Sequence, residues 1–263
     1  MLSDLFFKPE PESQYSALNA TRIRGTLERL THRITERFPG SGLSQVSAGL
    51  QDVASRIESL CIWLSHPLWP IRALAILAGL AVLGIFSLAI MMTLNAGPQA
   101  SSVSDLLQGI ESAINEIIFL SIALYFLSTL EGRIKRRAAL KALHRLRSIA
   151  HVVDMHQLSK DPNYVLTEST PTASSPERQF TSFELARYLD YCSELLSITS
   201  KLAALHAQYL NDPVVLNAVD DVEGLAHSLA AKIWQKIMIL DLAVQKPDST
   251  QRNDSPGGLT TAH

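Results

Sequence analysis

The chain has 263 residues, of which 47% are hydrophobic and 18% are charged, and its formal net charge at pH 7 is −2. It is therefore more apolar and less charged than a typical soluble domain. The net charge hides local blocks of opposite sign and says little about partners, and no nucleic-acid partner is expected. Cys61 and Cys192 are far apart in apolar helical patterns, which favours two buried thiols and excludes a disulfide framework or a cysteine metal site.

The first 66 residues are predicted to form a cytoplasmic amphipathic helical hairpin. Two runs of apolar residues at spacings of three and four are separated by Pro39-Gly40-Ser41-Gly42, which breaks the helix and turns the chain. The first run is Ile23, Leu27, Leu30, Ile34 and Phe38. The second run has the a/d spacing of a coiled coil and consists of Leu43, Val46, Leu50, Val53, Ile57, Leu60 and Leu64.

Two membrane-spanning helices follow, at 70–95 and 113–131. Residues 73–94 carry no charged side chain, and a run of this length crosses a hydrocarbon core of about 30 Å as a helix. A short extracytoplasmic loop, 96–112, is expected between the spans, although Ser102-x-x-Asp105 has the form of a capping box and allows a helix start near Val103. Asn115 and Glu116 are the polar residues at the outer end of the second span.

The charges that flank the spans predict the topology. The connecting loop contains no Lys or Arg, whereas a basic cluster follows the second span. This cluster consists of Arg133, Lys135, Arg136 and Arg137. By the positive-inside rule both termini lie in the cytoplasm, and the cluster is placed where it can contact anionic lipid.

Residues 132–161 are predicted to form a basic juxtamembrane helix with two different faces. One face is apolar, and the other carries His144, Arg147, His151 and Asp154, with His156 further round the helix. His151 and Asp154 are spaced i,i+3, so the carboxylate can orient the imidazole, and these two residues are the candidates for a catalytic pair. No histidines are spaced i,i+4, so no metal site is expected; a solvated face and a docking face both remain open.

This segment also carries a resemblance. The sequence RSIAHVVDMHQLSKDP, from Arg147 to Pro162, resembles a motif of bacterial membrane proteins that have two spanning helices and no assigned function. The resemblance implies the bacterial inner membrane and brings no activity, cofactor or site role with it.

The C-terminal part is predicted to be a flexible linker (162–181), a cytoplasmic antiparallel helical hairpin (182–245) and a disordered tail (246–263). Thr181-x-x-Glu184 has capping-box form, and Asp212-Pro213 fits the start of the second helix. The seam of that helix is Val215, Val219, Val222, Ala226, Leu229, Ile233, Ile237, Leu240 and Val244.

The fold class predicted is therefore an all-α membrane protein: a two-helix transmembrane hairpin with cytoplasmic coiled-coil or helical-bundle regions. The function predicted is an oligomeric scaffold or interaction protein of the inner membrane, without cofactor or metal and without an assigned reaction. Its partners are the lipid bilayer and either a second copy or another protein that covers the cytoplasmic seams. The alternatives are a subunit of an oligomeric channel or transporter, and a membrane-bound enzyme that uses the face of His151 and Asp154.

Overall fold

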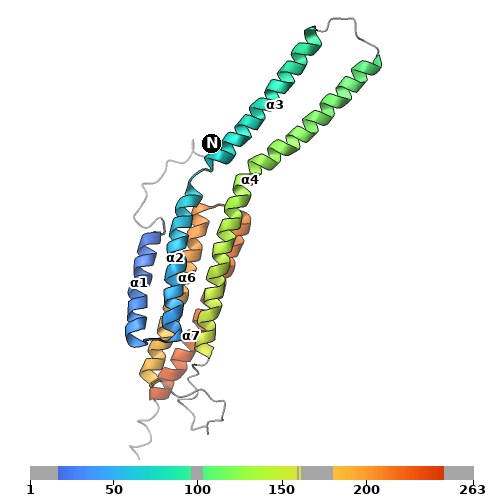
Figure 1. Ribbon diagram of the computed structural model, residues 1–263. Coiled ribbons are helices and arrows are strands. Elements are labelled where there is room, and N and C mark those ends of the chain that lie inside the picture. The colour runs from blue at the N-terminus through green and yellow to red at the C-terminus, as the bar shows by residue number, and fades with distance from the viewer. Residues whose placement is uncertain (1–16, 96–102, 159, 161–179, 246–263) are drawn as a thin grey trace, which may run out of the picture. The chain divides into compact units, whose positions relative to one another are not determined.

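The computed structural model describes residues 17–95, 103–158, 160 and 180–245, and within these ranges the regular structure is entirely α-helical. This confirms the all-helical prediction. The helices are α1 (Ala20–Arg37), α2 (Gly42–Ser65), α3 (Trp69–Asn95), α4 (Val103–Leu158), α6 (Ser182–Tyr209) and α7 (Pro213–Gln245) (Figure 1).

The chain divides into two compact units. Unit 1 comprises residues 1–61 and 140–263, and unit 2 comprises residues 62–139. Unit 1 therefore contains α1, most of α2, the C-terminal part of α4, α6 and α7. Unit 2 contains α3 and the N-terminal part of α4.

The helices of unit 1 pack side by side in a closed circuit (Figure 1). A polar contact or a close approach joins each neighbouring pair of helices in this circuit. These contacts are Arg24–Glu58 (3.1 Å, α1 to α2), Arg33–Glu194 (2.8 Å, α1 to α6), Ser200–Glu223 (3.2 Å, α6 to α7), Lys236–Gln157 (2.6 Å, α7 to α4) and the ring of His156 on Gly42 (α4 to α2).

α6 is the most deeply buried helix of unit 1. Its sequence predicts one half of a helical pair, but α6 contacts α1 as well as α7. It therefore buries residues on more than one side: besides Leu189 and Leu196, Tyr188, Leu195 and Leu205 are buried. α7, by contrast, buries a single stripe that includes Val215, Val222, Leu229, Ile233 and Leu240 of its predicted seam.

The seam of α2 differs in part from the expected one. Leu43, Leu50, Ile57 and Leu64 are buried as expected, but Val46, Val53 and Leu60 are only half-buried. The small residues next to them in the sequence are buried instead: Ser47, Ala54 and Cys61. Small side chains at every second seam position let neighbouring backbones approach closely, and branched side chains are then displaced to the edge of the contact.

Phe180, near the end of the region expected to be a linker, contacts aromatic residues at the end of α1 and in α6. Phe180 packs edge-on against Phe38, at 5.4 Å between ring centroids, and lies 5.5 Å from Tyr188. The Lys160 ammonium lies 4.4 Å from the centroid of the Phe180 ring, which is a favourable cation–π contact. Thr181 caps α6 in a complete capping box with Glu184. Residues 161–179 and the tail, 246–263, lie outside the described residues.

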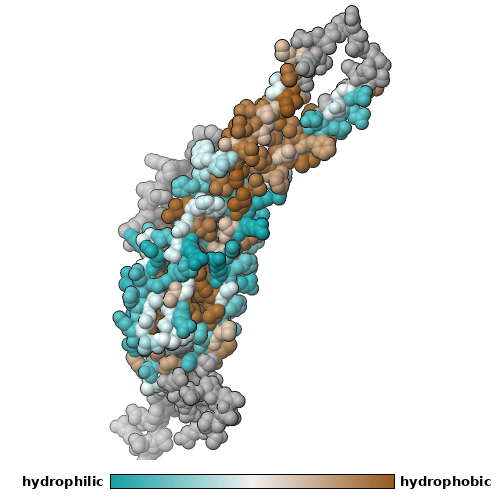
Figure 2. Space-filling view, viewed as in Figure 1, coloured by the Kyte–Doolittle hydropathy of each residue, from teal (hydrophilic) through white to brown (hydrophobic). Residues whose placement is uncertain are grey.

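Unit 2 presents apolar surface instead of burying it. Two helical stretches, within Gly42–Leu88 and within Leu107–Leu158, are long and apolar enough to cross a membrane, and none of either stretch is buried. Figure 2 shows hydrophobic residues gathered over α3 and the adjoining part of α4. In α3 the apolar side chains surround the helix, whereas a surface helix of a soluble protein has one apolar stripe.

α4 is one continuous helix of 56 residues. It begins at Val103, so residues 103–112 are helical and not part of the expected loop; of that loop, residues 96–102 lie outside the described ones. One helix includes both the segment 113–131 and the segment 132–158, which differ in charge and were expected to be separate elements.

The contact between Gly42 and His156 generates a first prediction. A Cβ atom at Gly42 would collide with the imidazole ring of His156, whereas a Cβ at Gly49 in the same helix meets nothing within 4 Å. We expect Gly42→Ala to lower the free energy of unfolding by about 1–2 kcal/mol, because overpacking displaces the ring. Gly49→Ala is the control and is expected to raise it by about 0.5–1 kcal/mol.

Thermal unfolding followed by circular dichroism measures both variants. The double variant Gly42→Ala/His156→Ala is expected to recover the loss, since the two residues are directly coupled. Equal behaviour of Gly42→Ala and Gly49→Ala would contradict this packing.

A second prediction concerns His206, which is fully buried in α6. Burial lowers the pKa of its imidazole below the ordinary value near 6.5. Below that pH the unfolded chain binds a proton that the folded chain excludes, so stability is complete above about pH 6.5 and decreases as the pH falls.

The expected slope is at most about 1.4 kcal/mol per pH unit for one group. We expect His206→Gln, which does not titrate, to flatten the dependence of the unfolding temperature on pH between 6.5 and 5. The exposed His227 supplies the control: His227→Gln is expected to leave that dependence unchanged. An unaltered slope in His206→Gln would show that other groups control the acid sensitivity.

Candidate functional site

The most densely connected polar site of unit 2 surrounds the break between α2 and α3. The break consists of His66, Pro67 and Leu68, and it separates a helix of unit 1 from the apolar helix α3. Two helix ends meet here, so the last carbonyl groups of α2 and the first amide groups of α3 lack partners within their own helices. Pro67 in addition has no amide hydrogen to donate.

Lys135 of α4 satisfies the carbonyl groups at the end of α2. Its ammonium donates hydrogen bonds to the carbonyl oxygen of Leu64 at 3.0 Å and to that of His66 at 2.9 Å. The carbonyl of Ile62 is satisfied locally by the Ser65 hydroxyl, at 2.7 Å. A cation is also the favoured charge at the C-terminal end of a helix, where the macrodipole is negative.

Glu131, one helical turn before Lys135, satisfies the start of α3. Its carboxylate accepts a hydrogen bond from the backbone amide of Leu68 at 3.3 Å. The same carboxylate binds Arg72 in the first turn of α3, at 2.8 Å from the Nε atom, and Lys135, at 3.0 Å. An anion at the N-terminal end of a helix is likewise favoured by the macrodipole.

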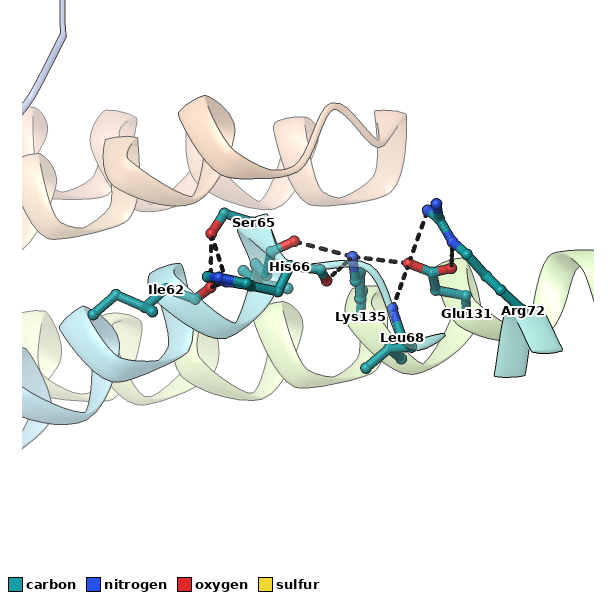
Figure 3. Close-up of polar contacts among 8 residues, drawn as sticks. Ile62, Ser65, His66, Leu68, Arg72, Glu131 and Lys135 are labelled. Carbon is teal, nitrogen blue, oxygen red and sulfur yellow. Dashed lines mark hydrogen bonds and ion pairs between the residues drawn. The ribbon is translucent and has the colours of Figure 1, made fainter. Parts of the chain in front are cut away.

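The site is thus a pair of helix caps supplied by a third helix (Figure 3). The side chains of Lys135 and Glu131 are 10% and 15% exposed, whereas that of Arg72 is 54% exposed. Burial of the central pair makes its hydrogen bonds strong and makes the removal of one partner costly. The arrangement connects α2, α3 and α4 through hydrogen bonds and ion pairs that join side chains to one another and to the backbone.

The basic cluster predicted to follow the second span is therefore divided by the structure. Lys135 faces the backbone at the end of α2 and is not available to lipid. Arg133 is exposed and lies over the ring of Phe126, at 5.3 Å from its centroid, and Arg137 is also exposed. Arg136 is half-buried.

The polar residues of the second span do not form a cluster in the structure. Asn115 and Glu116 are both exposed. Farther along α4 the Ser121 hydroxyl donates to the carbonyl oxygen of Ile117, and the Ser128 hydroxyl donates to that of Tyr125. These hydroxyl groups donate their hydrogen within their own helix.

The face predicted at the C-terminal end of α4 is only partly a surface. His144, Arg147 and His151 are exposed, and they remain candidates for a docking face. Asp154 accepts a hydrogen bond from Gln157 at 2.5 Å, and no hydrogen bond or ion pair joins it to His151 in the described part of the chain.

Gln157 in turn accepts a hydrogen bond from Lys236 of α7, so Asp154 belongs to the connection between α4 and α7. His156 is not on the exposed side with His151, because its ring rests on Gly42. The described residues contain no group of three His, Cys, Asp or Glu side chains that could hold a metal ion.

The site around Glu131 and Lys135 was missed by reasoning from sequence. Two signals were present: an acid and a base at spacing i,i+4, and a proline between two helical patterns. Neither signal says that residues more than sixty positions apart meet, and Lys135 was therefore assigned to the basic cluster.

The chain matches no protein-family model, no curated protein sequence and no solved structure. Among the described residues the chain is all-helical, and two of its helices are long and apolar enough to span a membrane.

The double cap generates a third prediction. We expect Lys135→Met to lower the unfolding temperature in detergent, because two carbonyl groups and a buried carboxylate lose a partner, at a cost of about 1–3 kcal/mol. Arg137→Met is the matched control, since it removes the same charge from an exposed position two residues away. Equal unfolding temperatures for the two variants would show that the cap contributes nothing.

Proposed function

We propose that the chain is a scaffold of the bacterial inner membrane, in which α3 and the N-terminal part of α4 form a transmembrane hairpin and the helices of unit 1 form a cytoplasmic body. The observation that carries this proposal is the exposure of the apolar stretches. A core helix of a soluble protein covers its apolar residues with other protein, whereas Leu77, Leu83 and Phe119 are between 63% and 74% exposed. Lipid is the solvent that such a surface requires.

The double cap supports the same proposal. Where a chain enters the hydrocarbon, unpaired backbone groups cost several kcal/mol each, since no water replaces the lost hydrogen bonds. Glu131 and Lys135 pair the backbone groups of Leu64, His66 and Leu68 directly before the apolar part of α3 begins.

The orientation rests on flanking charge. Arg72 lies before the first apolar stretch, and Arg133 and Arg137 lie after the second, whereas residues 95–112 contain no Lys or Arg. Basic residues near short loops remain on the cytoplasmic side, so both termini and all of unit 1 are cytoplasmic in this proposal.

A scaffold is favoured over a channel subunit or an enzyme by the polar contacts. The hydroxyl groups of Ser121 and Ser128 donate their hydrogen within their own helix, so only their acceptor capacity is left to line an aqueous path. The candidate catalytic residue Asp154 is bound to Gln157 and not to His151. The C-terminal hairpin and α1 instead bury a large helical core, which is the architecture of a binding or assembly module.

The fourth prediction tests membrane insertion and topology together. We expect the full-length chain to stay in the membrane pellet after extraction with alkaline carbonate. An alkaline phosphatase reporter is expected to be inactive when fused after His263 or before Met1, and active when inserted between Gly97 and Pro98. A green fluorescent protein at the two termini is the reciprocal control.

Release of the chain into the soluble fraction would remove the transmembrane hairpin from the proposal. Phosphatase activity at both termini would keep the hairpin and reverse its proposed orientation. Activity at one terminus only would mean that the two termini lie on opposite sides of the membrane.

A further inference from the structure

α7 carries a second apolar stripe, on the side opposite the core. Its buried stripe is centred on Leu229 and Ile233, whereas Trp234, Met238 and Leu242 are 56%, 62% and 66% exposed. These three residues are spaced i, i+4 and i+8, so they lie together on one face of the helix. Exposed large apolar residues that occur singly need no explanation, but a contiguous row of them marks an interaction surface.

The exposed stripe continues toward the start of α7 with small side chains. Gly224, Ser228 and Ala231 are exposed, and together with Gln235, Met238 and Leu242 they repeat at alternating spacings of four and three. Nothing lies within 4 Å of the position that a Cβ at Gly224 would occupy. This spacing is that of a coiled-coil seam, and small residues allow a second helix to approach closely.

The charges on α7 indicate which kind of surface meets this stripe. The stripe contains no Asp, Glu, Lys or Arg from Gly224 to Met238. The exposed charged residues of α7 are mostly acidic: Asp220 and Asp221 directly before the stripe, Asp241 at its C-terminal edge, and Lys232 on another side. An anionic membrane surface repels such a helix, because helices that lie on membranes have basic polar faces.

We propose that this face, the Trp234 face (Gly224, His227, Ser228, Ala231, Trp234, Gln235, Met238 and Leu242), binds the same face of a second copy of the chain. A two-fold interface brings each patch against itself, so any charge on the patch would meet a like charge. The Trp234 face avoids this repulsion because its centre is uncharged. Tryptophan and methionine are also enriched, and charges depleted, in the cores of protein interfaces.

The area is sufficient for a dimer of chains that share one membrane. The three large side chains expose roughly 350–400 Å² of apolar surface per copy, taking about 150–250 Å² for each whole side chain. Both copies then bury roughly 700–800 Å² through these residues alone, and the flanking small residues bring the contact toward ~1,200 Å², the lower end of the range for specific interfaces. The transmembrane hairpin raises the effective concentration of one copy near another.

The dimer makes a second copy of the chain the partner of the proposed scaffold, so this inference rests in part on the proposed function. The two can fail separately. Dimerisation is measured in detergent micelles, where membrane topology has no influence, and the reporter fusions are read without reference to oligomeric state.

The fifth prediction is a comparison of two methionines. Met238 on the Trp234 face and Met155 on α4 are 62% and 67% exposed, so replacing either by glutamine leaves the core intact. We expect the full-length chain in detergent to have the protein mass of a dimer by light scattering. Met238→Gln and Trp234→Gln are each expected to raise the dimer dissociation constant at least about 30-fold, as truncation of an interface hot spot does. Met155→Gln is expected to leave it unchanged.

Cross-linking in native membranes locates the contact. Cys61 and Cys192 are buried, so a cysteine at Ala231 is the reactive thiol for a short bis-maleimide. Ala231→Cys is expected to give a cross-linked species of twice the chain mass, and Lys232→Cys, an exposed position about 100° around the helix from Ala231 and outside the stripe, is expected to give little.

Three outcomes would overturn the proposal. One is a monomer at every concentration, and another is a dimer that neither Trp234→Gln nor Met238→Gln weakens. The third is a cross-link from Ala231→Cys to a different protein or to another part of the same chain. Circular dichroism of each variant shows that helix content is retained.

Discussion

The structure depends on one constraint: the backbone groups at a helix break beside an apolar helix must all find partners. Glu131 and Lys135 meet this requirement for the turn between α2 and α3, because their side chains bind the backbone of Leu64, His66 and Leu68. Without these two side chains, the carbonyl and amide groups at the break would be unpaired and next to the apolar surface of α3. The ion pair is thus mainly a device for satisfying the backbone. Its own Coulombic attraction is a smaller matter, since a buried pair gains little over the cost of removing it from water.

Unit 1 follows a different principle. Its core is apolar and its connections are polar, so packing supplies the stability and the contacts at the edges fix which helices are neighbours. Lys236 and Gln157 join α7 to α4, and Arg33 and Glu194 join α1 to α6. An exposed ion pair such as Arg33–Glu194 is worth about 0–1 kcal/mol, so it contributes more to the choice of neighbours than to stability. The Lys236–Gln157 contact is a part-buried hydrogen bond from a charged donor to a neutral acceptor. The Trp234 face differs, because an apolar stripe of α7 stays exposed there among the described residues.

The fold was largely predictable from periodicity, for reasons that particular helices illustrate. α7 has one apolar stripe that is buried, and its predicted seam from Val215 to Leu240 includes almost every residue that is buried. α2 offers two neighbouring stripes, Val46 with Val53 and Ser47 with Ala54, and periodicity alone selects the more hydrophobic of them. The protein buries the stripe of smaller residues. Which stripe is buried depends on the distance between neighbouring helices, and the pattern of a single helix does not contain that distance. The capping site was beyond prediction for a similar reason: spacing along α4 reveals that Glu131 and Lys135 are neighbours, but not which chain ends they reach.

The order of the two charges along α4 has a directional meaning. The carboxylate comes first and reaches an amide hydrogen, and the ammonium comes one turn later and reaches carbonyl oxygens. Exchanging the two residues would keep an ion pair of the same strength, yet it would set a positive group against the amide and a negative group against the carbonyls. The pair therefore fixes the direction of α3 as well as its attachment. It binds the N-terminal end of that helix, and it would not bind the same helix running in the opposite direction.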